Sequence, residues 1–187
     1  MTQTIRERAD TVGTLRYVSV FLMETLARWV PSTPELEAKV LFGRHVWEFA
    51  QHADALGKRT AELRAALHYN LPPTAGYGTL LQHLTSTAAT ADRIVSFYEG
   101  MLTELESRYR QYLDATDALL DDPTVRIIER VLPDLERMRR EAAMTLAEYP
   151  SLGTATRGLA ADIASRFAAV DPWVAHRPPA MSSGVLA

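Results

Sequence analysis

The chain has 187 residues and a formal net charge of −3, with 47% hydrophobic and 23% charged residues, which is ordinary for a globular protein. This charge balance gives no overall positive field, so we expect no nucleic-acid partner. The sequence contains no cysteine, which excludes disulfides, zinc-thiolate centres, iron-sulfur clusters and thiol nucleophiles. The start, MTQTIRERAD, lacks an apolar signal core. In the apolar run over 12–30, Arg16, Glu24 and Arg28 leave an uncharged window only over 17–23, far short of the ~20 residues that cross a bilayer. We therefore expect a cytoplasmic protein without a membrane segment.

A first helix is predicted over residues 8–30. Its apolar stripe has spacings of three and four and consists of Val12, Leu15, Val18, Leu22, Leu26 and Trp29. Tyr17, Phe21 and Glu24 share a second side, so this helix has two faces to cover, in a bundle interior or in a dimer contact.

The second helix is predicted from Pro34 to Tyr69. The sequence VPSTP at 30–34 separates the two helices, with Ser32 or Thr33 as the cap and Pro34 in the first turn. This short connection predicts an antiparallel pair. Asn70-Leu71-Pro72-Pro73 cannot continue the helix, and the glycines that follow suit a long crossing.

Three further helices are expected. The third begins after Thr79 with a weak stretch at 85–90, and its stripe is Ala91, Val95, Tyr98, Leu102, Leu105, Tyr109, Leu113 and Leu120. The fourth starts at Asp121-Asp122-Pro123-Thr124 and runs to Glu148, with a kink at Pro133 and the stripe Ile127, Ile128, Val131, Leu132, Leu135, Met138 and Ala142. A short fifth helix from Thr154 to Val170 is expected to cover one end. We thus predict an all-α fold, with one bundle domain over 1–170 and an extended or disordered tail over 171–187 in which Trp173 docks locally.

The polar residues with the most chemical potential lie on the second helix. Spacings of three and four place His45, Glu48, His52 and Arg59 on one side. The two histidines are seven residues apart, about 10 Å along the axis, so one ion cannot easily be held by both.

Three interpretations of this cluster stay open. Glu48 and His52 could bind one metal ion with carboxylates from other helices, or a histidine oriented by Glu48 could serve as a metal-free acid-base catalyst. The third interpretation is a buried polar network that only fixes the helix register.

Other candidates are weaker. Tyr98, Tyr109 and Tyr17 could line a substrate pocket together with Arg59, although buried tyrosines more often serve packing. Trp47 lies on the opposite side of the second helix and suits a helix or subunit contact, which leaves a homodimer open. The charge run over 129–141 is interpreted as a solvated helix face without a function.

The four long helices, the segment HVWEFAQHAD on the second and the segment DDPTVRIIERVLPD on the fourth together resemble the ferritin-like superfamily of four-helix bundles, over roughly residues 6–149. This resemblance implies a crossover between the second and third helices. It also implies two irons that activate dioxygen to oxidise an organic substrate, held by one carboxylate from each of two helices and by Glu-x-x-His pairs from the other two.

The residues depart from that ligand pattern. Three residues after Glu48 stands Gln51, with His52 one further on, and Glu136 is followed at the third place by Arg139. The remaining carboxylates to consider are Glu24 on the first helix, Glu99 or Glu106 on the third, and Asp134 as the one inward acid of the fourth. A standard di-iron centre is therefore not expected, while iron in a single site that uses Glu48, His52 and Glu24 stays open.

These observations lead to one functional hypothesis and one alternative. The hypothesis is a ferritin-like biosynthetic enzyme that acts on a small molecule with His52, Glu48 and His45, either as a metal-dependent oxidoreductase or by metal-free acid-base chemistry. The alternative is a non-catalytic ligand-binding or partner-binding protein.

Overall fold

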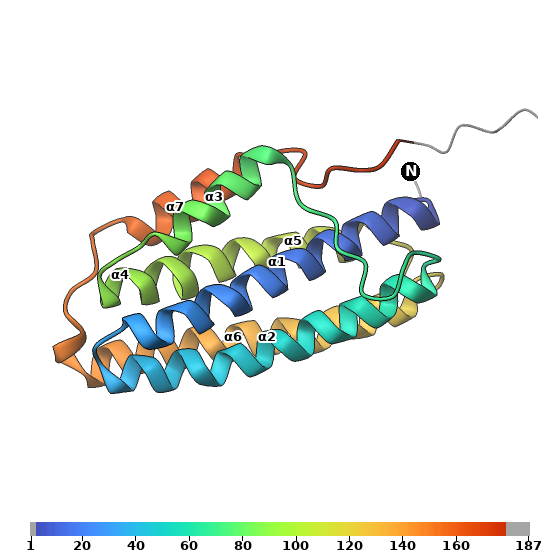
Figure 1. Cartoon of the computed structure of the whole chain (residues 1–187). Helices are drawn as coiled ribbons and strands as arrows, with labels where there is room; N and C mark the ends of the chain where they lie inside the picture. The colour runs from blue at the N-terminus through green and yellow to red at the C-terminus, as the bar shows by residue number, and fades with distance from the viewer. Residues whose placement is uncertain (1–2, 179–187) are drawn as a thin grey trace, which may run out of the picture.

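The structure, a computed structural model, describes residues 3–178 and is built from helices joined by turns (Figure 1). The bundle helices are α1 (Ile5–Ser32), α2 (Leu36–Glu62), a continuous third helix made of α4 (Thr90–Ile94), the π-helix η1 (Val95–Met101) and α5 (Leu102–Ala115), and α6 (Asp122–Glu148). The shorter elements are α3 (Ala75–Thr85), the 3-10 helix η2 (Pro150–Leu152) and α7 (Leu159–Ala168). The predicted all-α class is confirmed.

The connection between α2 and α4 crosses the length of the bundle. It leaves the far end of α2, includes α3, and returns the chain to the end at which α2 began (Figure 1). Helix α2 and the α4 to α5 helix therefore run in the same direction, while α1 and α2 are antiparallel. This is a crossover arrangement and not a simple up-and-down bundle.

The boundary between α1 and α2 differs from the prediction. Helix α1 continues through Pro31 to Ser32, and α2 is preceded by Glu35, whose side chain makes no capping bond. The residues expected to cap α2 are used elsewhere, because the hydroxyl of the buried Thr33 accepts a hydrogen bond of 2.8 Å from Arg93 Nη1.

Helix α2 ends at Glu62 and does not reach Tyr69 as expected. Arg64 and His68 adopt left-handed backbone angles, with φ of 61° and 55°, which an α-helix cannot contain. The chain folds back on the helix, where the Thr60 hydroxyl donates to the Ala66 carbonyl at 2.9 Å.

The predicted third helix is divided. The Thr- and Ser-rich stretch is a complete break, so α3 is a separate helix and the bundle helix starts only at Thr90. That helix ends at Ala115, which leaves Leu120 in the following turn with 66% of its surface exposed. Leu120 is therefore wrongly assigned to the inward stripe, since hydrophobicity alone does not tell an exposed turn leucine from a core one.

The fourth helix follows the prediction more closely. Helix α6 starts at Asp122 and passes through Pro133 without a break to Glu148. Its buried residues are Ile128, Val131, Leu135, Met138 and Ala142, all of them from the predicted stripe, and Thr124 in the first turn.

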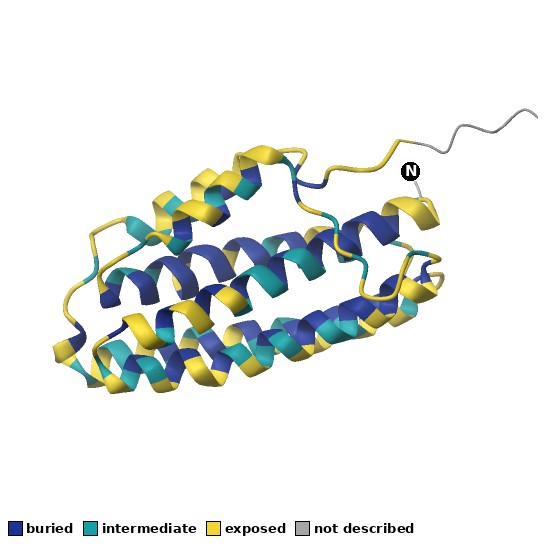
Figure 2. Cartoon of the chain, viewed as in Figure 1, coloured by how far each residue is buried: buried dark blue, intermediate teal, exposed yellow. Residues whose placement is uncertain are grey.

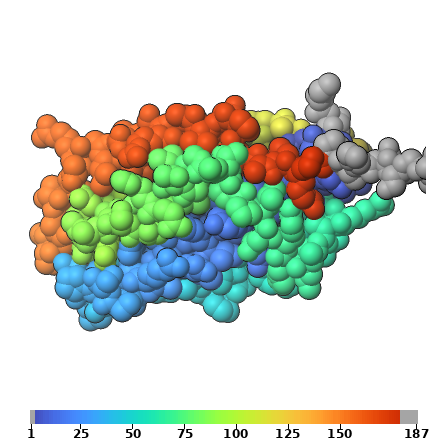
Figure 3. Space-filling model, turned by 45° about the horizontal axis from the view of Figure 1, so that its top comes forward, coloured from blue at the N-terminus to red at the C-terminus, as the bar shows by residue number. Residues whose placement is uncertain are grey.

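The fifth helix is shorter than expected and lies elsewhere. Helix α7 does not close an end of the bundle but lies beside α3 on one long side, where it packs against η1 and α5 (Figures 1 and 3). The described part of the tail then continues over the bundle, with Trp173 buried and the Arg177 Nε atom 2.6 Å from Asp10 Oδ1. Residues 179–187, the rest of the predicted tail, lie outside the described residues.

The core extends along the whole bundle. Burial is highest on the inner face of α1 and along the α4 to α5 helix (Figure 2). Its centre includes the aromatic side chains of Trp29, Phe42, Phe49 and Phe97, whose neighbouring ring centroids are 5.6–5.9 Å apart. Within residues 3–178, no helix combines the length and the apolar character that crossing a membrane requires.

Candidate functional site

Helix α2 carries two buried histidines on the face that it turns toward α6. His45 is fully buried and His52 is 5% exposed, because the seven-residue spacing returns a side chain to the same face after two turns. Glu48 lies between them along the chain, with 24% of its side chain exposed. The sequence thus correctly places these three residues along one seam, whose other side is formed by α6.

The first part of the seam is a contact between His52 and two carboxylates. His52 Nε2 lies 3.1 Å from Asp134 Oδ2. One atom each from Glu48, His52 and Asp134 fall within 4.8 Å of one another, which is close enough for a shared ion. His52 Nδ1, in contrast, is buried and has no hydrogen-bond partner among the described residues.

The second part of the seam reaches from the surface into the core. His45 Nε2 lies 3.2 Å from Glu141 Oε2, and His45 Nδ1 lies 2.7 Å from the Tyr98 hydroxyl. Tyr98 is fully buried in the π-helix η1, a kind of helix that is frequent at functional sites. The carboxylate of Glu141, with 25% exposed side chain, is the outer end of this chain of contacts.

Arg137 joins the two parts. Its Nη2 atom lies 2.7 Å from Asp134 Oδ1 and 3.1 Å from Glu48 Oε1, and its Nη1 atom lies 3.4 Å from Glu141 Oε1. The result is one connected set of side chains, called here the seam network. It consists of Tyr98, His45, Glu141, Arg137, Asp134, Glu48 and His52.

The protonation states of the seam network follow from burial and pairing. Burial lowers the pKa of His45 and of His52, and this outweighs the opposing effects of Glu141 and Asp134. Partial burial acts to raise the pKa of Asp134, but hydrogen bonds from Arg137 and His52 bring it below its usual value. Burial likewise acts to raise the pKa of Glu141, and hydrogen bonds from Arg44 and His45 bring it below its usual value. Near pH 7 the imidazoles are therefore neutral and these two carboxylates are ionised.

The other predicted site residues lie apart from the seam network. Arg59 donates from Nη2 to Asp121 at 2.7 Å and from Nε to Thr124 at 2.8 Å, so it holds the start of α6. Tyr109 is buried in the core and Tyr17 is half-buried against it. Glu24 is exposed and pairs with Arg28 at 3.2 Å. These positions do not support the predicted substrate-binding role of the first three or a metal-ligand role for Glu24.

The α6 residues of the seam network are the ones that the sequence interpretation mostly missed. The charge run over 129–141 is not entirely a solvated face, because Asp134, Arg137 and Glu141 contact α2. Their spacing of three and four on one side of α6 was the available signal. Asp134 alone was identified as an acid that could face inward.

A single divalent ion fits the residues around His52 in part. A neutral imidazole with two carboxylates is a ligand set for zinc, manganese or ferrous iron. Two features oppose tight binding: the Arg137 guanidinium contacts both carboxylates and would have to be displaced, and His52 Nδ1–H would find no acceptor when Nε2 binds the ion. Loss of such an outer partner typically costs 10- to 100-fold in metal affinity.

Two irons do not fit these residues. The carboxylates expected from the other helices point to solvent or are held by arginines. Glu24 pairs with Arg28, Glu99 is exposed, Glu106 pairs with Arg110 and Arg139, and Glu136 pairs with Arg140. Ligands on the α1 and α5 side of a two-metal centre are thus not supplied by the residues that the resemblance points to.

A surface groove of about 460 Å³ lies beside the outer end of the seam network, between the first half of α2 and the last half of α6. Its wall includes Glu141 and Arg44, together with Leu36, Val40 and Met144, which are exposed apolar side chains. The outer end of the seam network is therefore open to a small molecule.

Comparison with known proteins adds no assignment: no family model, curated protein or solved structure matches this chain.

Proposed function

We propose that the protein is a small-molecule enzyme of ferritin-like architecture that works with one divalent metal ion, held by Glu48, His52 and Asp134. The observation that carries this proposal is the convergence of three ligand atoms within 4.8 Å, from two helices, at a half-buried seam. The protonation states agree with it, since a metal ligand must be a neutral imidazole or an ionised carboxylate.

In such an enzyme, different side chains of the chain would hold the ion and contact the substrate. A divalent ion held by these residues would supply Lewis-acid chemistry, and iron would add redox chemistry. Arg137, with a third of its side chain exposed, would have to give up its contacts to Glu48 and Asp134 for these carboxylates to hold an ion. The groove beside Glu141 has an apolar wall, and it lies two turns of α6, about 10 Å, from Asp134, so a substrate that uses both would have to extend along the seam.

A metal-free reaction is the second candidate, and a specific observation favours it. Arg137 already balances the charge of Glu48 and Asp134, and Asp134 orients the His52 imidazole at 3.1 Å. A histidine oriented by a carboxylate through one ring nitrogen can act as a general acid-base group at the other. Asp134 occupies Nε2 here, so proton transfer would take place at Nδ1, which has no hydrogen-bond partner among the described residues.

Titration with Co²⁺ tests the metal proposal. Cobalt is a spectroscopic substitute for zinc or iron, and the expected result is one ion per chain with an affinity at least tenfold weaker in Asp134→Asn. The matched control is Asp122→Asn, an exposed carboxylate of the same helix that pairs with Arg126, and it should leave affinity unchanged.

Arg137→Gln separates a metal site from a purely structural network. If the guanidinium competes with the ion, its removal raises Co²⁺ affinity by about tenfold, although it removes ion pairs. If neither the natural chain nor Arg137→Gln binds Co²⁺ saturably, the metal proposal is refuted and the metal-free acid-base reaction remains. Two tightly bound ions per chain would refute the single-ion site.

A further inference from the structure

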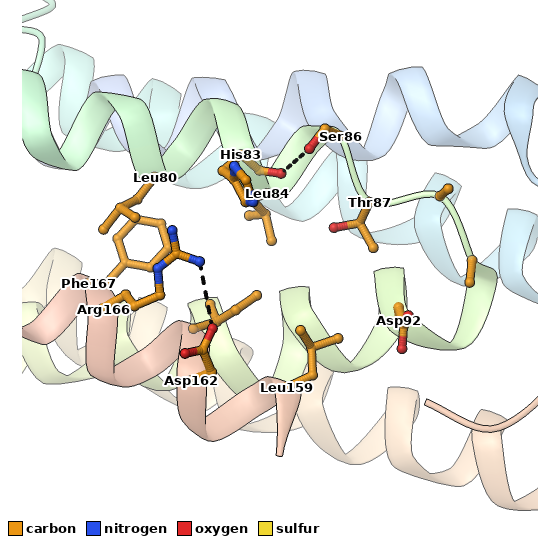
Figure 4. Close-up of a pocket in the computed structure, with 13 residues that line it drawn as sticks. Leu80, His83, Leu84, Ser86, Thr87, Asp92, Leu159, Asp162, Arg166 and Phe167 are labelled. Atoms are coloured by element: carbon orange, nitrogen blue, oxygen red, sulfur yellow. Dashed lines mark hydrogen bonds and ion pairs between the residues drawn. The ribbon is translucent and has the colours of Figure 1, made fainter. Parts of the chain in front are cut away.

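A second hollow lies on the opposite side of the bundle from the seam network, between α3 and α7 (Figures 1 and 4). The two short helices meet at one end, where the rings of Tyr77 and Phe167 are 4.8 Å apart. They part toward the end of α3 and the start of α7, near Leu84 and Leu159, and this leaves a cleft of about 440 Å³. We call it the α3–α7 cleft.

The inner surface of the α3–α7 cleft is apolar. Side chains of Leu80, Leu84, Leu159, Ile163 and Phe167 line it. Its volume is within the range of pockets that hold small organic molecules, which are mostly apolar with a few polar groups that fix orientation. The contact between α7 and the bundle helix sets its depth, because Gly100 lets Ile163 come so close that a β-carbon there would lie 2.9 Å from Ile163 Cγ2.

The rim of the cleft carries the side chains of Arg166 and His83 beside two acids, Asp92 and Asp162. Arg166 pairs with Asp162 only at 3.6 Å, beyond hydrogen-bond length, and its guanidinium points into the gap between the two helices (Figure 4). The imidazole of His83 lines the same cleft from α3. Asp92, the other acid of the rim, is already committed, since it accepts from the Thr156 backbone at 2.6 Å and from the Thr156 hydroxyl at 3.0 Å.

We propose that the α3–α7 cleft binds a small amphipathic molecule whose apolar body lies on Leu84, Ile163 and Phe167 and whose carboxylate or carbonyl head accepts hydrogen bonds from Arg166 and His83. An acceptor head group is expected because the Arg166 guanidinium has further N–H groups to donate, while Asp162 is its ion-pair partner and Asp92 is held by Thr156. The cleft shares no residue with the seam network, so this site does not depend on the proposed metal chemistry.

Three ten-carbon probes distinguish the kinds of head group: decanoate, 2-decanone and decylammonium. Calorimetric titration of the full chain gives the affinities, and amide chemical shifts in NMR spectra locate the bound probe. Decanoate and 2-decanone are expected to bind with shifts centred on α3 and α7, and decylammonium at least tenfold more weakly than decanoate. If decylammonium binds as tightly as decanoate, or if the shifts centre on other helices, the proposal is refuted.

Two variants test the geometry. Arg166→Gln should weaken decanoate binding by about tenfold, the usual effect of losing one charge-assisted hydrogen bond, and 2-decanone binding by less. The matched control is Arg126→Gln, another exposed arginine in an i, i+4 ion pair, which should change neither. Ala88→Trp places a large ring on the exposed rim and should weaken both ligands at least tenfold. Unchanged decanoate affinity in folded Ala88→Trp, checked by circular dichroism, would overturn the assignment of the cleft.

Discussion

Replacing Asp121 by alanine should destabilise the protein more than any other single carboxylate change at the start of α6. Asp121 has no exposed surface and lies 2.7 Å from each of Arg59 Nη2, the Tyr112 hydroxyl and the Thr124 hydroxyl. Thr116 adds a fourth contact at 3.0 Å. The cluster joins α2, α5 and α6 at one corner of the bundle.

The magnitude follows from what remains after the substitution. Breaking a buried ion pair typically costs about 3–5 kcal/mol, because the remaining charge is left without its partner. Arg59 would keep its 2.8 Å contact with the exposed Glu62, which places the cost near the lower end, at about 3 kcal/mol. With a urea dependence of about 2–3 kcal/mol/M, the unfolding midpoint should fall by roughly 1–1.5 M.

Urea unfolding followed by circular dichroism provides the measurement, and the next residue provides the control. Asp122 is half exposed and pairs with Arg126 at 2.8 Å on the surface, so Asp122→Ala should cost no more than about 1 kcal/mol. If the two variants differ by less than about 1 kcal/mol, the structural role assigned to Arg59 and Asp121 is wrong, and a functional role for Arg59 would have to be considered again.

Two further predictions concern the seam network and the packing of α7. Because burial holds the pKa of His45 and His52 below the unfolded value of about 6.5, the unfolded chain binds more protons as pH falls through that value. The free energy of unfolding should therefore drop below pH 6.5 by up to about 1.4 kcal/mol per pH unit for each histidine, and a His45→Gln/His52→Gln variant should show a flatter pH profile in urea unfolding. Gly100→Ala should destabilise by about 1–3 kcal/mol, since its methyl group would meet α7, whereas Gly43→Ala, with nothing within 4 Å, should stabilise by up to about 1 kcal/mol. Equal thermal shifts for these two alanine variants would contradict the close packing of α7.

Helical periodicity correctly predicted helices that bury one face and expose the other. The stripe of α6 and the Asp-Asp-Pro-Thr start were predictable, since Pro123 suits the first turn and the apolar residues recur every three or four positions. The end of α2 was not predictable in the same way. Left-handed residues are usually glycine or asparagine, and here they are Arg64 and His68, whose conformation is supported by tertiary contacts such as the bond from His68 N to Gly57 O.

The candidate site was predictable on α2 and only in part on α6. His45 and His52 share phase with the apolar residues of their helix, so their burial could be inferred from spacing alone. Asp134 and Glu141 lie at the flank of the buried stripe of α6, where a charged side chain can face either solvent or the neighbouring helix. Which of these occurs depends on the partner across the seam, and a single sequence does not specify that partner.

The π-helix η1 contacts both the seam network and the wall of the α3–α7 cleft. Tyr98 and Gly100 are two residues apart, so they point to nearly opposite sides of the same helix. On one side Tyr98 reaches His45 at 2.7 Å, and on the other Gly100 receives Ile163 from the wall of the α3–α7 cleft. The wider hydrogen-bonded turn of a π-helix changes the phase of every residue after it. A regular α-helix over Val95–Met101 would therefore turn either Tyr98 away from His45 or Gly100 away from Ile163. The π-helix thus allows both contacts to form.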